Sequence, residues 1–238
     1  MLKLRSLVIT DDSEVWERLG FRVVDRRVRI GEVELHLVGT PADPLLPRGI
    51  VGWKFATDGD RPLPLSIDGI AVTGEPTTDA RPTHADPHAN LVCNIDHLVV
   101  STPQIDRTIS AFENVGLDCR RQRERTYGSG DRTTTMRQAF FWLGGAGAAP
   151  DDRVLCEVVG PKIVDRAKAE DPASFFGLAF TSHDLDATVA AMGEHHIKPA
   201  ITAVQSGRRI ATIRSSAGST VPIAIMSPHV NPTDAASP

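Results

Sequence analysis

Two side chains of the sequence, His97 and Glu157, are of residue types that can transfer protons or hold a metal ion. His97 lies in the segment IDHLVV (95–100) and Glu157 in VLCEVV (154–159), and both segments have the apolar, β-branched composition of strands. Because alternate residues of a strand share a face, Asp96 is expected to point away from the face of His97. We therefore do not expect Asp96 to contact His97.

The chemistry of this pair has three interpretations. An imidazole and a carboxylate on one face suit Fe, Mn, Zn or Ni as divalent ions. Without a metal ion, they can form an acid–base pair, or they can be a hydrogen-bonded remnant of an ancestral site. Catalytic zinc and facial iron sites take three protein ligands, so a metal ion would need a further donor, for which His36, His84 and His88 are the candidates.

An internal repeat positions the two residues. Segments 95–108 and 175–188 align at an offset of 80 residues, and each predicts a strand followed by a helix that begins near an aspartate. The helices are expected at about 104–115 and 184–193. The strand-like pieces that follow lie at 117–126, 134–143 and 152–159 in the first copy and at about 199–205, 208–215 and 220–227 in the second.

Shorter copies of the repeat open the chain. Ser6 aligns with His97, and His36 aligns with Glu157. A further fragment, 52–57, matches 177–182. The sequence therefore predicts an α+β protein built from paired β-α-β-β-β modules, with a degenerate N-terminal pair. The expected domains are a degenerate half at 1–75, a linker at 76–93, paired modules at 94–228 (94–161 and 173–228) and a flexible tail at 229–238.

The opening strand DHLVV (96–100) and the closing strand CEVVGP (156–161) resemble those of the vicinal oxygen chelate superfamily. That superfamily includes glyoxalase I, extradiol dioxygenases, methylmalonyl-CoA epimerase and bleomycin resistance proteins. The resemblance covers 95–228 and, more weakly, 1–57. It implies that two modules set their sheets side by side as cupped mixed sheets.

The resemblance also implies a ligand set, with one metal ligand from the first strand and one from the last strand of each module. His97 and Glu157 stand at these positions in the first module, and Gly177 and Ala224 in the second. Glycine and alanine cannot coordinate a metal ion through a side chain. The expected cofactor is therefore one divalent metal ion or none.

Two functions from different classes follow. The first is a glyoxalase-like small-molecule enzyme (a lyase, isomerase or dioxygenase) that uses His97 and Glu157 on a substrate with neighbouring oxygens. The alternative is a non-catalytic protein of the bleomycin resistance type that binds or sequesters a small molecule and has an eroded metal site. Met136, Phe140 and Trp142 share a strand face and could line an apolar pocket or fill the core.

Two groups of arginines have open roles. Arg208, Arg209 and Arg214 surround the third strand of the second module. They could bind a carboxylate or phosphate, or they could form a solvated strand face. Arg214 is our candidate for a ligand contact. The arginines at 120–125 alternate with other polar residues, which favours a charged edge strand that blocks aggregation.

Composition excludes several partners. The net charge is −4, which gives no electrostatic reason to expect nucleic acid, and no apolar run is long enough for a membrane span. The three cysteines are odd in number and lack a C-x-x-C spacing, so neither a disulfide framework nor a zinc knuckle is expected. No G-x-G-x-x-G, P-loop or G-x-S-x-G motif occurs. We expect a cytoplasmic protein that binds a small molecule and could form a homodimer.

Overall fold

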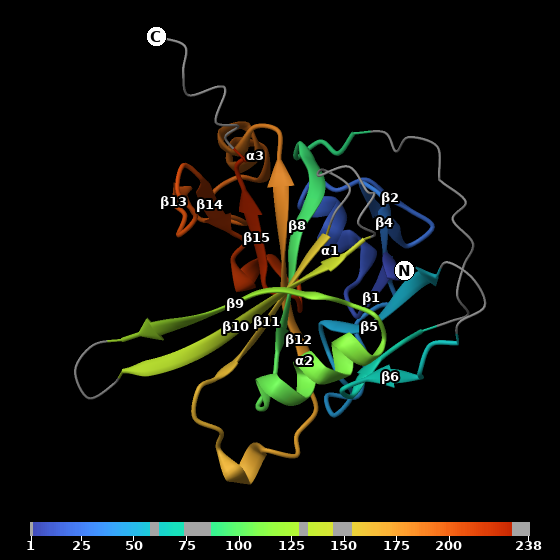
Figure 1. The fold of residues 1–238 in the computed structure, drawn as a ribbon. Coiled ribbons are helices and arrows are strands. Elements are labelled where there is room, and N and C mark those ends of the chain that lie inside the picture. The colour runs from blue at the N-terminus through green and yellow to red at the C-terminus, as the bar shows by residue number, and fades with distance from the viewer. Residues whose placement is uncertain (1, 58–61, 74–86, 129–132, 145–153, 230–238) are drawn as a thin grey trace.

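Two curved β-sheets form the framework of the computed structural model, which describes residues 2–57, 62–73, 87–128, 133–144 and 154–229 (Figure 1). The larger sheet has the strand order β13-β14-β15-β12-β8-β11-β10-β9, and the smaller sheet has the order β2-β3-β4-β1-β5. The strands of the larger sheet are β8 (Val92–Ser101), β9 (Cys119–Tyr127), β10 (Thr134–Leu143), β11 (Val154–Pro161), β12 (Ser174–Ser182), β13 (Ile201–Thr202), β14 (Arg209–Thr212) and β15 (Ile223–Met226).

The remaining elements are short. The strands of the smaller sheet are β1 (Leu2–Ile9), β2 (Val23–Val24), β3 (Arg27–Ile30), β4 (Val33–Leu37) and β5 (Ile50–Thr57), and β6 (Ser66–Ile67) and β7 (Ile70–Ala71) form a hairpin. The helices are α1 (Ser13–Arg18), α2 (Ile105–Asn114) and α3 (Leu185–Met192), with 3-10 turns at Arg166–Lys168 and Ser215–Ala217. None of the described helices is long and apolar enough to cross a membrane.

The larger sheet consists of two β-α-β-β-β modules joined through their first strands. In each module the last strand runs parallel to the first, β11 beside β8 and β15 beside β12, while β8 and β12 are antiparallel to each other. This strand order confirms the expected α+β fold of paired modules. The expected helices agree with α2 and α3 to within one residue at each end.

The smaller sheet repeats the same register. Glu157 of β11 is paired with Val99 of β8, and His36 of β4 is paired with Val8 of β1. Val8 is also paired with Gly52 of β5, as Val99 is with the glycine at 177 of β12. The smaller sheet is therefore a third module joined to the first strand of a fourth, the degenerate N-terminal pair.

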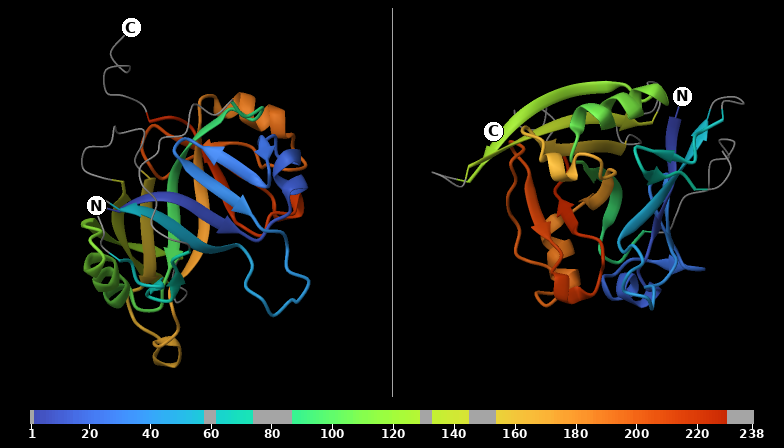
Figure 2. Two further views of the ribbon diagram at one scale, coloured as in Figure 1. Left: turned by 90° about the vertical axis from the view of Figure 1, so that its right-hand side faces the viewer. Right: turned by 90° about the horizontal axis from the view of Figure 1, so that it is seen from below.

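Aromatic side chains pack α2 and the smaller sheet against one face of the larger sheet. Phe112 of α2 is fully buried, and its ring centroid lies 5.0 Å from that of Phe141 in β10 and 5.5 Å from that of Trp53 in β5. The ring centroid of Phe180 in β12 lies 5.6 Å from that of Phe21 in the N-terminal module. Figure 2 shows α2 and the smaller sheet beside the larger sheet from two further sides. A candidate functional site is therefore expected on the opposite face of the larger sheet, which α2 and the smaller sheet do not cover.

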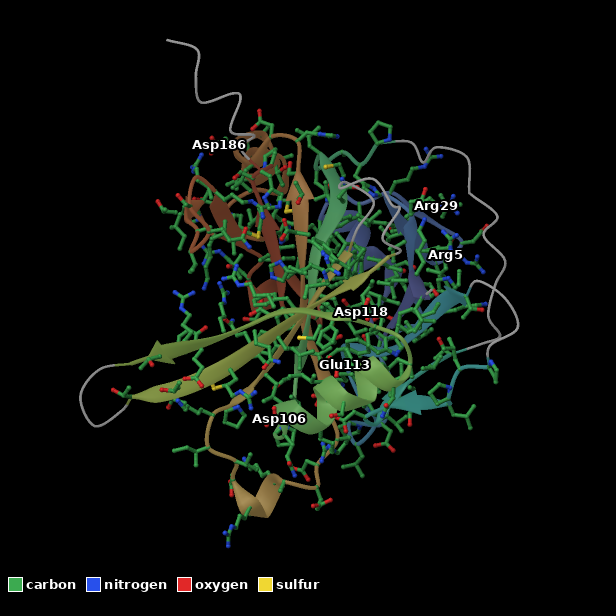
Figure 3. All side chains as sticks on the ribbon, in the orientation of Figure 1. Arg5, Arg29, Asp106, Glu113, Asp118 and Asp186 are labelled. Atoms are coloured by element: carbon green, nitrogen blue, oxygen red, sulfur yellow. The ribbon has the colours of Figure 1, made fainter. Side chains whose placement is uncertain are left out.

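The aspartate near the start of each long helix is paired with an arginine of a neighbouring strand. Asp106 of α2 accepts a hydrogen bond from Arg137 at 2.7 Å, and Asp186 of α3 accepts one from Arg209 at 2.7 Å (Figure 3). Negative charge is favourable near a helix N-terminus, so these acids stabilise the helices that the sequence predicts. Arg209 is thereby assigned to the helix side of the sheet.

A buried carboxylate joins the two halves of the chain. Asp11 follows β1 and is 1% exposed. It accepts hydrogen bonds from Trp16 Nε1 at 3.0 Å, from Ser219 Oγ at 2.7 Å and from the backbone N–H of Thr220 at 2.7 Å. The N-terminal module is thus tied to the loop that precedes β15.

Candidate functional site

His97 and Glu157 lie on adjacent strands, on the face of the larger sheet that is turned away from α2. Their chain neighbours Leu98 and Cys156 are fully buried on the other face, in the core that α2 covers. Figure 1 shows the joined ends of β9 and β10 and the strands β13–β15 on one side of β8 and β12, with the smaller sheet on the other side. The face that carries the two residues is therefore the concave face of a cupped sheet.

The strand register orders this face in rows that cross neighbouring strands. One row consists of Trp142, Leu155, His97, Ala179 and Ala224. The adjacent row consists of Arg121, Phe140, Glu157, Val99 and Gly177. His97 and Glu157 are therefore diagonal neighbours, with Cα atoms about 8 Å apart for ordinary strand spacing and rise.

Asp96 contacts His97, contrary to the expectation from strand alternation. His97 is paired with Ala179 and Ile95 with Phe180, so the register between β8 and β12 shifts at Asp96, which forms a bulge. Oδ1 of Asp96 lies 2.8 Å from Nδ1 of His97. The expectation was wrong because a bulge reorients a side chain that regular alternation would turn to the other face.

A buried arginine holds Asp96 in turn. The side chain of Arg208, just before β14, is 2% exposed, and its Nη2 lies 2.5 Å from Oδ2 of Asp96. Arg208 also donates to the carbonyl oxygen of Ser227, and Thr181 donates to Asp96 at 3.0 Å. Burial alone raises the pKa of Asp96, but the hydrogen bonds from His97 and Arg208 and the charge of Arg208 outweigh it and hold this pKa well below its usual range.

The sequence left Arg208 with two roles, binding of a carboxylate or phosphate and a solvated strand face, and predicted neither its burial nor its contact with Asp96. Its burial depends on a partner 112 residues away in the chain, which no local pattern encodes. The one indication of a role for Arg208 in the sequence was its position at the start of a predicted strand.

The contact with Asp96 determines which nitrogen of His97 is available. A carboxylate only accepts hydrogen bonds, so Nδ1 carries the hydrogen and donates it to Asp96, and in the neutral ring Nε2 therefore has the lone pair. Nε2 has no hydrogen-bond partner in the described part of the chain, and the side chain is 16% exposed. An imidazole oriented in this way can accept a proton or coordinate a metal ion through Nε2.

Glu157 is held by a separate chain of polar contacts. Gln138 of β10, which is 4% exposed, donates a hydrogen bond from Nε2 to Oε1 of Glu157. The side-chain oxygen Oε1 of Gln138 in turn accepts a hydrogen bond from Nε of Arg123 at 2.5 Å. No described hydrogen bond joins Glu157 to His97. The two predicted residues thus share a face but are oriented by different partners.

The described donors do not fit a metal centre of the expected type. No group of three or more His, Cys, Asp or Glu residues that could hold a metal ion occurs among the described residues. A Cβ atom at Gly177 would lie 2.5 Å from the carbonyl oxygen of Pro222, so this backbone has no room for a ligand side chain there. Ala224 carries no donor.

The further donors that the sequence suggested do not complete the set. His36 lies on β4 of the smaller sheet, whose register belongs to the N-terminal module. Both ring nitrogens of His88 are engaged, Nδ1 by the backbone N–H of Arg22 and Nε2 by the carbonyl oxygen of Arg29, each at 2.9 Å. His84 lies outside the described residues.

The remaining candidate residues divide into two groups. Met136, Phe140 and Trp142 are partly buried on the concave face. The register places Trp142 in the row of His97 and Phe140 in the row of Glu157, whereas Met136 lies two rows beyond Glu157. Arg214 lies beyond the end of β14, where its Nε donates to the carbonyl oxygen of Glu194, in the segment after α3, at 2.8 Å.

No protein-family model and no curated protein sequence matches the chain. Among solved structures, it is similar to a variant of Streptomyces coelicolor methylmalonyl-CoA epimerase in complex with 2-nitronate-propionyl-CoA, at 16% identity over 58% of this chain and 99% of that chain (TM-score 0.42). It is also similar to methylmalonyl-CoA epimerase from Mycobacterium tuberculosis, at 18% identity over 65% of this chain and 97% of that chain (TM-score 0.42).

A third similar structure is methylmalonyl-CoA epimerase in complex with methylmalonyl-CoA and NH4+, at 15% identity over 57% of this chain and 94% of that chain (TM-score 0.40). At these values, the similarities carry no argument about the reaction. The strand order and register of the chain itself confirm the fold of paired β-α-β-β-β modules that the resemblance to the vicinal oxygen chelate superfamily implied.

Proposed function

We propose that the protein is a glyoxalase-like small-molecule enzyme, an isomerase or lyase that moves a proton on a substrate with neighbouring oxygens. The substrate lies on the concave face of the larger sheet, with His97 as the acid–base residue. Glu157 is the second acid–base residue. The chain of contacts from Arg208 through Asp96 to His97 carries this proposal.

A buried ion pair is weak support for a purely structural role. Bringing Arg208 and Asp96 out of water costs about as much free energy as their attraction returns. What the pair supplies is an imidazole with one protonation pattern and one orientation, which a general base requires. A cup that only bound an apolar ligand would not need this arrangement.

The proposal gives each group a role. Nε2 of His97 takes a proton from a carbon beside a carbonyl group, and the imidazolium that forms is stabilised by the Asp96 carboxylate. Glu157, one row away and fixed by Gln138, exchanges a proton with the neighbouring oxygen of the substrate. The described donors do not form a site for a metal ion, so the proposed proton transfers use the side chains of His97 and Glu157.

The test is proton exchange in deuterated water. A panel of 2-oxo acids, 2-hydroxy ketones and 1,3-dicarbonyl acids is incubated with the protein, and loss of the activated C–H signal is followed by NMR. His97→Gln is expected to slow exchange at least about 100-fold, the usual contribution of a general base. The matched control His183→Gln, at an exposed histidine, should retain it. Exchange that is equal in the wild type and in His97→Gln would refute the role of His97.

A second function is favoured by the second module. Gly177 and Ala224 remove two of the expected ligand positions, and Phe140 and Trp142 offer an aromatic wall on the same face. This combination suits a non-catalytic protein that sequesters a small molecule. Binding of a panel compound without proton exchange, unchanged in His97→Gln, would support that alternative.

A further inference from the structure

Three arginines on β9 face the concave side of the sheet. They alternate along the strand, so they share one face. The register pairs Arg121, Arg123 and Arg125 with Phe140, Gln138 and Met136, respectively, which belong to the concave face. We call Arg121, Arg123 and Arg125 the arginine ridge.

Aromatic rings hold the ridge in place. The guanidinium carbons of Arg121 and Arg123 lie 5.8 and 4.9 Å from the ring centroid of Phe140, and that of Arg125 lies 5.3 Å from the ring centroid of Tyr127. A guanidinium packed on a ring keeps N–H groups at its edge for binding an oxyanion. The rings therefore restrict the arginines without neutralising them.

The nearby carboxylates are engaged elsewhere. Glu124, between two ridge residues, points to the other face and is paired with Lys162 at 2.7 Å. Asp106 is paired with Arg137 at 2.7 Å. In the described chain, no ion pair joins a ridge arginine to a carboxylate, and Glu157 is the one acid that the register places in the adjoining rows. The ridge side of the concave face thus carries excess positive charge.

We infer that the arginine ridge binds an oxyanion of the substrate, a carboxylate or a phosphate, while the reacting carbon lies toward His97. This inference rests on the proposed function and adds the substrate class, a small anionic compound. Arginine binds such groups through two parallel hydrogen bonds. Because Arg123 is linked to Glu157 through Gln138, the oxyanion lies about one row from the acid–base pair.

Binding of inorganic phosphate and of malonate tests the inference without any reaction. Both are titrated into the protein, and affinity is measured by calorimetry. The tryptophan emission gives a second readout, because Trp142 is partly exposed on the concave face whereas Trp16 and Trp53 are fully buried. Tighter binding of malonate identifies a carboxylate as the preferred group, and tighter binding of phosphate identifies a phosphate.

The variant Arg121→Gln/Arg125→Gln removes two charges of the ridge and leaves the contact of Arg123 with Gln138 in place. It should weaken anion binding at least about tenfold, the loss of one charge-assisted hydrogen bond. The control Arg166→Gln/Lys168→Gln removes the same charge from the exposed turn between β11 and β12 and should bind as the wild type does.

His97→Gln separates this inference from the proposed function. It should bind both anions with unchanged affinity, even where proton exchange is lost. If no panel compound exchanges but the ridge variant still loses anion binding, the ridge is upheld and the proposed reaction fails. Three results would overturn the inference and leave β9 as a charged edge strand. The wild type and the ridge variant bind the anions equally well, the wild type binds neither anion, or the ridge variant differs from the wild type only in self-association.

Discussion

Replacement of Arg208 by Met tests the chain of contacts behind His97. The variant keeps most of the side-chain volume but removes the ion pair with Asp96 and the hydrogen bonds to the carbonyl oxygen of Ser227. It leaves the Asp96 carboxylate 5% exposed, with hydrogen bonds from His97 and Thr181 alone. Breaking a buried ion pair from one side costs about 3–5 kcal/mol, and the two remaining hydrogen bonds place the expected loss near the lower value.

Urea denaturation measures this loss. With a slope of about 3 kcal/mol per molar urea for a chain of this size, the midpoint should fall by roughly 1 M. Arg209→Met is the matched control, since this neighbouring arginine forms an exposed pair with Asp186 and should leave the midpoint unchanged. The double variant Asp96→Asn/Arg208→Met removes both charges and should be more stable than Arg208→Met. An unchanged midpoint in Arg208→Met, or additive losses in the double variant, would refute a coupled buried pair.

Three further predictions concern stability. The pKa of Asp96 in the folded protein lies below its ordinary value of 3.8, so the contribution of its carboxylate to the free energy of unfolding is complete above that pH and is lost as the pH falls toward the folded pKa. The urea midpoints of the wild type and Asp96→Asn should therefore differ above about pH 4 and converge as the pH falls below it. A difference between the midpoints that grows in acid would contradict this. Gly177→Ala should lower the thermal midpoint, at a cost of about 1–3 kcal/mol, because its Cβ would meet the carbonyl oxygen of Pro222 at 2.5 Å; an unaltered midpoint would show that this backbone yields. Asp11→Ala should lower the free energy of unfolding by about 3 kcal/mol, because it leaves the hydrogen-bond donors of Trp16 and of the loop before β15 unsatisfied. A variant that resists proteolysis as well as the wild type does would count against this tie between the two halves.

The sequence was sufficient to predict the modules because two periodicities survive in it. Residues such as Leu98 and Val100 alternate along β8 with period two, and Ile105, Ile109 and Phe112 recur at helical spacing in α2. The match of 52–57 to 177–182 agrees with the register, in which β5 stands beside β1 as β12 stands beside β8. Patterns of this kind depend on each segment alone.

The site could be predicted only in part. Alternation grouped each of His97 and Glu157 with its neighbours on its own strand, and the resemblance implied that both face the cup. The bulge at Asp96 results from a register shift against β12, which is a property of two strands together. Gln138 was recognisable as a polar residue on the face of β10, yet its contact with Glu157 depends on the pairing of β10 with β11. The pairing of Arg208 with Asp96 joins the two modules and has no local signature.

The proposed reaction depends on Asp96 holding His97 with the hydrogen on Nδ1 and with Nε2 free on the concave face. Long-range proton–nitrogen NMR of protein labelled in histidine, at a pH where the ring is neutral, reports this directly once the His97 signals are assigned with His97→Gln. We expect a protonated Nδ1 and an unprotonated Nε2 in the wild type, and loss of that pattern in Asp96→Asn. A wild-type ring that carries its hydrogen on Nε2 would contradict it.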